Sequence, residues 1–134
     1  MTSMNVIYQG DLRTQITHSS TQTKLITDAP LDNQGKGQSF SPTDLMSSSL
    51  GSCMLTIMGI KARTIGIDID GTEVNIEKIM TKSPPRKVAE IMVTFNWKGK
   101  KFAPEILQQL KDAALTCPVA LSLHPDIKKT INFS

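Results

Sequence analysis

The sequence has few aromatic side chains and no concentration of positive charge. It contains four Phe, one Tyr and one Trp in 134 residues, so its core must be built mainly from aliphatic residues and seven methionines. The formal net charge of +3 arises from basic residues that are spread along the chain. Nucleic-acid binding requires clustered charge together with stacking aromatics or a recognisable motif, and neither is present. We therefore expect no nucleic-acid partner.

Two kinds of hydrophobic segment are also missing. The opening MTSMNVIYQGD has no basic start followed by an apolar run, so it does not resemble a secretory signal. The most apolar stretch, 45–62, is interrupted by serines, glycines and a lysine, and we expect it to be too polar to span a bilayer. The sequence thus predicts a cytoplasmic protein with no membrane partner, in a compartment where structural disulfides are rare.

A metal site is not expected. The two cysteines, Cys53 and Cys117, do not form a Cys-x-x-Cys motif. The two histidines, His18 and His124, lie far in sequence from each other and from both thiols. Because zinc sites normally draw their ligands from closely spaced Cys and His residues, this pattern does not predict one.

The order of predicted elements indicates one α+β domain that covers residues 1–134. Apolar and polar residues alternate over 4–27, which predicts strands with a turn near Gly10. Residues 28–40 form a loop by composition, and such long loops are often functional. Alternation over 73–80 and 90–97 predicts a hairpin. A second helix is predicted at 104–115 and a short helix at 118–123, with a break between them because the residue before Pro118 disfavours helix. A final strand is predicted at 127–133.

A long helix is predicted to begin at Ser41. Ser41 is a good N-cap, Pro42 suits the first helical position, and Asp44 stands where a capping box places its acidic residue. We expect the helix to end near 64–66. The residues expected to form its apolar stripe are Met46, Leu50, Cys53, Ile57 and Ile60. Small residues at 48, 52 and 59 form a second stripe that would let another element approach closely.

The two thiols stand in different local settings. Cys53 lies well inside the long helix among apolar neighbours, so it would need a cation from elsewhere in the fold to react. Cys117 directly precedes Pro118, close to the N-terminus of a following helix, where free N–H groups stabilise an anion. The sequence therefore predicts that Cys117 is the more acidic thiol. Each cysteine taken alone is also compatible with simple burial in a core.

The segments SPTDLMSSSLGSCMLTIMG and TCPVALSL together resemble the OsmC/Ohr family, the osmotically inducible protein C and organic hydroperoxide resistance proteins. The shared features are a Ser-Pro helix start, a small and apolar stretch around a central Cys, and a second Cys before a Pro. The preceding TDAPLDNQGKGQSF resembles the family's loop, in particular that of its less characterised bacterial branch. The resemblance implies antiparallel sheets packed around a long central helix, in an intertwined homodimer.

The resemblance also implies a chemistry. Cys53 would be the peroxidatic thiol that reduces an organic hydroperoxide to an alcohol and becomes a sulfenic acid. Cys117 would resolve it as a Cys53–Cys117 disulfide, which an external dithiol, such as a dihydrolipoyl protein, reduces. No metal or flavin is implied. The alternative is an OsmC-fold protein without peroxidase turnover that binds a small apolar or acyl ligand at the dimer interface.

One part of the family's site does not match. The family holds its thiolate with an arginine from the N-terminal strands, and Arg13 is the only arginine in that region. In the family, a glutamate holds this arginine in place, and this chain has Thr43 at the position of that glutamate. Thr43 can accept a hydrogen bond but carries no charge, and Asp44 is one residue further along the helix. Thr43 and Asp44 are therefore the predicted supporting residues, and the missing glutamate favours the binding alternative.

Overall fold

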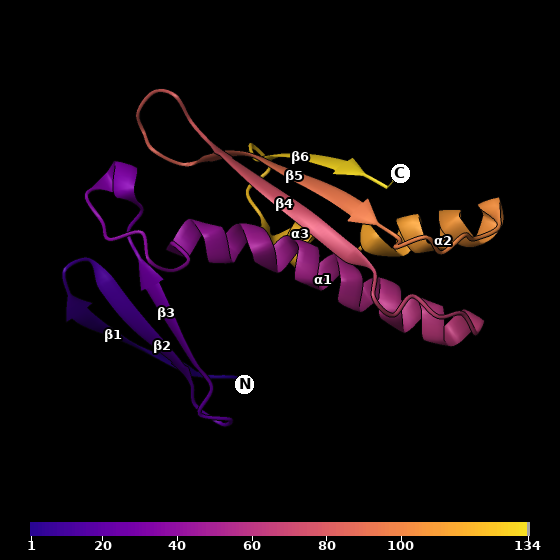
Figure 1. The fold of residues 1–134 in the computed structure, drawn as a ribbon, viewed down its shortest axis with the longest axis horizontal. Helices are drawn as coiled ribbons and strands as arrows, with labels where there is room; N and C mark the ends of the chain where they lie inside the picture. The colour runs from indigo at the N-terminus through magenta and orange to yellow at the C-terminus, as the bar shows by residue number, and fades with distance from the viewer. Residues whose placement is uncertain (134) are drawn as a thin grey trace. The chain divides into compact units, whose positions relative to one another are not determined.

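The computed structural model describes residues 1–133, and these form two compact units (Figure 1). Residues Met1–Met46 make up the first unit, and the second begins at Ser47. The expectation of one domain over 1–134 stays a prediction. The elements are those of an α+β protein, as the sequence predicts.

The first unit contains a three-stranded antiparallel sheet. Its strands are β1 (Met4–Gly10), β2 (Arg13–His18) and β3 (Lys24–Asp28), and they lie in the order β1-β2-β3. The turn between β1 and β2 has positive φ angles at Gly10, Asp11 and Leu12. The predicted strands and turn are confirmed. The loop after β3 contains one short 3-10 turn, Leu31–Asn33.

The helix α1 (Pro42–Ile65) has the predicted start and end. At its start, the Asp44 N–H donates to Ser41 Oγ at 3.0 Å, and the Ser41 N–H donates to Asp44 Oδ2 at 2.8 Å. This reciprocal pair is a capping box, which satisfies backbone donors that a helix start leaves open. The chain leaves the helix at Gly66, whose φ of 74° suits glycine after a helix end.

The face of α1 that is buried differs from the predicted apolar stripe. Its buried residues are Ser47, Leu50, Gly51, Met54, Met58 and Ala62. Of the predicted stripe only Leu50 is buried, Cys53 is half-buried, and Ile60 is 58% exposed. The prediction failed because apolar residues occur all around this helix, so periodicity cannot select a face. The buried face is set instead by the close approach of α1 to β4 (Glu73–Met80). At Gly51 an added Cβ would lie only 2.8 Å from Ile76 Cδ1.

The sheet of the second unit is mixed rather than antiparallel. It has the order β4-β5-β6, where β5 is Val88–Asn96 and β6 is Lys128–Asn132. The β4–β5 hairpin is antiparallel, as predicted, but β5 and β6 pair in parallel. The expectation of antiparallel sheets is therefore wrong for β6. The chain between β5 and β6 runs through α2 (Pro104–Ala114) and α3 (Pro118–Ser122), and helical crossovers of this kind join parallel strands.

Aromatic side chains cluster at the end of this mixed sheet. The Phe95 ring stacks on Trp97 and on Phe133, with centroid separations of 5.7 and 4.8 Å. The Trp97 indole N–H donates to the Phe133 carbonyl at 2.8 Å, which ties the end of β5 to the residue after β6. Lys111 of α2 places its ammonium 5.6 Å from the Phe133 ring centroid. Stacking and cation–π contacts of this kind stabilise the end of the sheet.

Helix α1 is long and apolar enough, by length and composition alone, to cross a membrane. Its best window of 18 residues has a mean hydropathy of 1.2. The expectation that polar residues make this stretch too polar to span a bilayer is not supported by that measure. Core helices of soluble proteins meet the same criterion, so it is weak support for a membrane span.

Candidate functional site

The structure brings the two cysteines together within the second unit. Cys53 projects from α1 and is half-buried, whereas Cys117 is fully buried at the start of α3. Both thiols are free, and Cys53 lies close enough to Cys117 to raise the pKa of the Cys117 thiol. The Cys53–Cys117 disulfide that the family resemblance implied stays a prediction. A more exposed thiol beside a buried one suits a division of labour between a thiol that meets a substrate and one that does not.

The environment of Cys117 makes it less acidic, not more. Its sulfur does accept a hydrogen bond from the Ala120 N–H at 3.2 Å, as expected for the N-cap of α3. Burial nevertheless raises the pKa of the Cys117 thiol, and the neighbouring Cys53 raises this pKa further. The prediction that Cys117 is the more acidic thiol failed because desolvation outweighs the N–H groups of a helix only five residues long.

This raised pKa predicts that stability depends on alkaline pH. A cysteine in the unfolded chain has a pKa of about 8.5. Above that pH the unfolded chain has released a proton that the folded chain still holds, so the free energy of unfolding falls as pH rises through the raised pKa of Cys117. We expect urea midpoints followed by circular dichroism to fall above about pH 8.5, and to fall less in Cys117→Ala. An equal fall of the urea midpoint with pH in the wild type and in Cys117→Ala would contradict this prediction.

Arg13 is held within the first unit by a fork of hydrogen bonds. Its Nε donates to Asp28 Oδ1 at 2.7 Å and its Nη2 donates to Asp28 Oδ2 at 2.8 Å. The same Nη2 donates to Gln38 Oε1 at 2.9 Å. The side chain of Asp28 is fully buried, while that of Arg13 is 28% exposed. The guanidinium beside Asp28 holds the pKa of this carboxyl below its usual range, so the carboxylate stays charged at neutral pH.

The sequence did not single out Asp28 and Gln38, because both lie in the stretch 28–40 among several other polar residues. The structure places the predicted supporters of Arg13, Thr43 and Asp44, in the cap of α1. Thr43 Oγ1 lies 3.2 Å from Ser41 Oγ, and the Asp44 carboxylate takes part in the capping box. A register argument could have found Asp28, because it pairs with Arg13 across β2 and β3. That register is fixed only once the strand ends are known.

Two hollows lie beside these elements. In the first unit, a shallow one of about 370 Å³ is lined by Gln38, Phe40 and Asp44, together with Gly37 and Ser39. In the second unit, one of about 430 Å³ lies at the end of α1.

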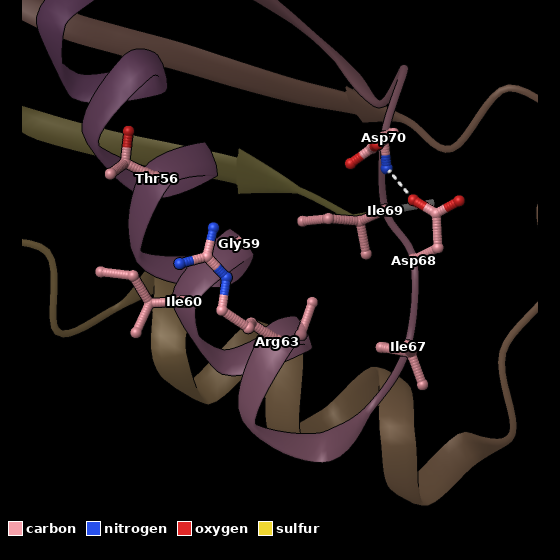
Figure 2. A pocket seen from close by; sticks show the side chains of 9 residues that line it. Thr56, Gly59, Ile60, Arg63, Ile67, Asp68, Ile69 and Asp70 are labelled. Carbon is pink, nitrogen blue, oxygen red and sulfur yellow. Dashed lines mark hydrogen bonds between the residues drawn. The ribbon is translucent and has the colours of Figure 1, made fainter.

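Figure 2 shows the larger hollow, with Arg63 extending from α1 and Asp68 pointing away from the helix. Its walls carry the side chains of Ile60, Ile67 and Ile69. Asp68 pairs with Lys100 at 3.3 Å. None of the predicted site residues lines this hollow.

Comparison with family models assigns the chain to a known family. The family model described as OsmC-like protein matches residues 35–132, which include α1 and both cysteines. The chain belongs to the OsmC-like family. A search of proteins with curated descriptions gives no match.

Solved structures of OsmC-like proteins have the same fold. A Psychrobacter arcticus protein, provisionally described as an osmotic stress induced and detoxification response protein, is 50% identical and has a TM-score of 0.90 over 100% of this chain and 96% of its own. An OsmC-like protein from Mycoplasma pneumoniae is 17% identical, with a TM-score of 0.81 and the same coverage. The organic hydroperoxide resistance protein OsmC from Legionella pneumophila is 13% identical, with a TM-score of 0.74 and the same coverage. The α+β arrangement of two small sheets and helices is that of OsmC-like structures.

Proposed function

We propose that this OsmC-like protein is a thiol-dependent peroxidase that reduces organic hydroperoxides to alcohols. The observation that carries the proposal is the proximity of a half-buried Cys53 to a buried Cys117, which raises the pKa of the Cys117 thiol. Further support comes from the structural likeness to a protein named for organic hydroperoxide resistance. In this proposal Cys53 meets the peroxide, Cys117 resolves the oxidised thiol, and Arg13 stabilises the thiolate.

The reaction has three balanced steps. The Cys53 thiolate attacks the distal oxygen of ROOH, the O–O bond breaks, and the leaving alkoxide takes a proton to become ROH. Cys53 is now a sulfenic acid, which the Cys117 sulfur attacks to form an S–S bond with loss of water. An external dithiol then reduces the Cys53–Cys117 disulfide by exchange and is itself oxidised to a disulfide. We propose a dihydrolipoyl protein as one such reductant, with no metal or flavin.

We propose further that the active form is a homodimer. The first unit supports this, because apolar residues on its outer strands have little cover. In β1, Val6, Ile7 and Tyr8 are 59%, 54% and 64% exposed, and in β3 Leu25 is 48% exposed. Apolar surface gathered on one small sheet commonly marks an interaction site. Light scattering at micromolar concentration tests the dimer, and a monomeric mass would contradict it.

A titration of thiols tests the peroxidase. Free thiols are counted before and after one equivalent of cumene hydroperoxide or a fatty-acid hydroperoxide. We expect rapid loss of both thiols, formation of one equivalent of alcohol, and recovery of both thiols with dihydrolipoamide. A chain that keeps its thiols while the peroxide persists would contradict the proposal.

The second candidate function is binding of a small apolar or acyl ligand without turnover. The hollow of about 430 Å³ favours it, since isoleucines line its walls beside Arg63. Within residues 1–133, the Arg63 guanidinium has no ion-pair partner, so it could receive a carboxylate. Saturable binding of a fatty acid that Arg63→Ala weakens, in a protein that does not consume peroxide, would select this function.

A further inference from the structure

We propose that Asp28 is the positioning residue of Arg13, in the role that a glutamate at the start of the long helix fills elsewhere in the family. It acts by fixing the guanidinium so that the Nη1 edge faces the anion that Arg13 serves. This inference rests on the proposed function only in naming that anion as the Cys53 thiolate. The arrangement of Asp28 and Arg13 itself stands on the structure of the first unit.

The geometry fixes the orientation of the guanidinium. Asp28 receives two parallel N–H bonds, from Nε and Nη2 of Arg13, at 2.7 and 2.8 Å. Such two-point contacts set the plane of an arginine, which a single bond or a bare charge cannot do. Gln38 Oε1 accepts a further hydrogen bond from Arg13 Nη2 at 2.9 Å. Three of the five donors of the guanidinium are therefore committed to one side.

Asp28 is itself held rigidly. Its backbone N–H donates to the Phe40 carbonyl at 3.0 Å, and its Oδ2 accepts the Gln38 backbone N–H at 3.1 Å. Its position opposite Arg13 in the β2–β3 register fixes the distance between the two backbones. Arg13, Gln38 and the more distant Lys36 all lower the pKa of the Asp28 carboxyl. A fully buried carboxylate is costly unless it is paired, so this contact differs from an ordinary surface ion pair.

The remaining edge of Arg13 is available. Within the described chain, residues 1–133, the two Nη1 hydrogens have no partner, and the side chain is 28% exposed. A guanidinium fixed on one side and open on the other can bind an anion with little loss of side-chain entropy. Thr43, at the family's glutamate position, is uncharged. Asp28 therefore supplies, from the end of β3, the negative charge that this position lacks.

The test measures how fast iodoacetamide alkylates Cys53, with the label located by peptide mapping, in the full-length protein. We expect Asp28→Asn to slow alkylation at pH 7 roughly tenfold or more, because the amide loses the two-point contact that orients the guanidinium, and a misplaced cation no longer favours the ionised form of the thiol. Arg13→Ala should slow it at least as much, and the double variant no further. At about pH 10.5, where a thiol ionises without help, all variants should react alike. Asp28→Glu, which keeps the charge, should restore part of the rate.

The matched control is Asp11→Asn, the same change at an exposed carboxylate of the same unit. It should leave alkylation unchanged, and circular dichroism checks that each variant is folded. A normal rate in Asp28→Asn beside a slow Arg13→Ala would overturn the proposal, and so would normal rates in both. Because alkylation needs no peroxide, the expected pattern in a protein that does not consume hydroperoxide would refute the proposed function and leave the role of Asp28 intact.

Discussion

Cys53→Ser is expected to abolish hydroperoxide consumption, leaving only the rate seen in buffer. A serine hydroxyl is a far weaker nucleophile than a thiolate at neutral pH, and Cys117 is the one thiol that this variant retains. The measurement is the loss of cumene hydroperoxide in the presence of excess dihydrolipoamide. Cys117 remains in this variant, so it also reports whether a buried thiol can replace the half-buried one.

Cys117→Ser is the matched control, because it removes the other thiol by the same change. It should still reduce one equivalent of peroxide and then accumulate a sulfenic acid on Cys53, which dimedone traps. Consumption at the wild-type rate in Cys53→Ser would refute the assignment of the peroxidatic thiol. Loss of the first equivalent in Cys117→Ser would show instead that Cys117 takes part in the attack.

Arg13→Ala is expected to slow the first step by about a hundredfold. Removing one preorganised donor from a site that stabilises a developing negative charge typically has an effect of this size. The step is followed by rapid mixing with one equivalent of hydroperoxide and by the loss of free thiols.

Arg13→Lys provides the control. It keeps the charge but cannot make the two-point contact with Asp28, so it should recover only a small part of the rate. Full activity in Arg13→Lys would mean that charge alone matters and that orientation does not. An unchanged rate in Arg13→Ala would assign the thiolate to another cation.

Local signals in the sequence predicted most of the elements. The bounds of α1 follow from Ser41, Pro42 and Asp44 at one end and Gly66 at the other, and the structure confirms both ends. The break at Pro118 is likewise confirmed, because α2 ends at Ala114 and α3 begins at Pro118. These features depend on neighbouring residues, so a single sequence is enough to find them.

Features that depend on distant residues were not predictable. The buried face of α1 is decided by contact with β4, as at Gly51 and Ile76, and not by the spacing of apolar residues along the helix. The parallel pairing of β6 depends on the path through α2 and α3. The same holds for the candidate site: Arg13 was proposed through the family resemblance, and its partner Asp28 became visible only with the strand register.

The proximity of the two thiols came from likeness to a family and not from residue spacing. Local reasoning on Cys117 even gave the wrong direction for its pKa, because the effect of the α3 N-terminus was visible in the sequence and desolvation was not. Burial is a property of the folded chain as a whole. Predictions of reactivity for single cysteines therefore need coordinates, even where the fold is known.

Each of the two units contains one residue whose spectrum can report on its unfolding. The chain has one tryptophan and one tyrosine, and Trp97 lies in the second unit whereas Tyr8 lies in the first. Loss of the indole bond on denaturation should shift tryptophan emission, while tyrosine absorbance follows the three-stranded sheet. Melting curves followed by tryptophan emission and by tyrosine absorbance therefore distinguish cooperative from stepwise unfolding of the two units without any label.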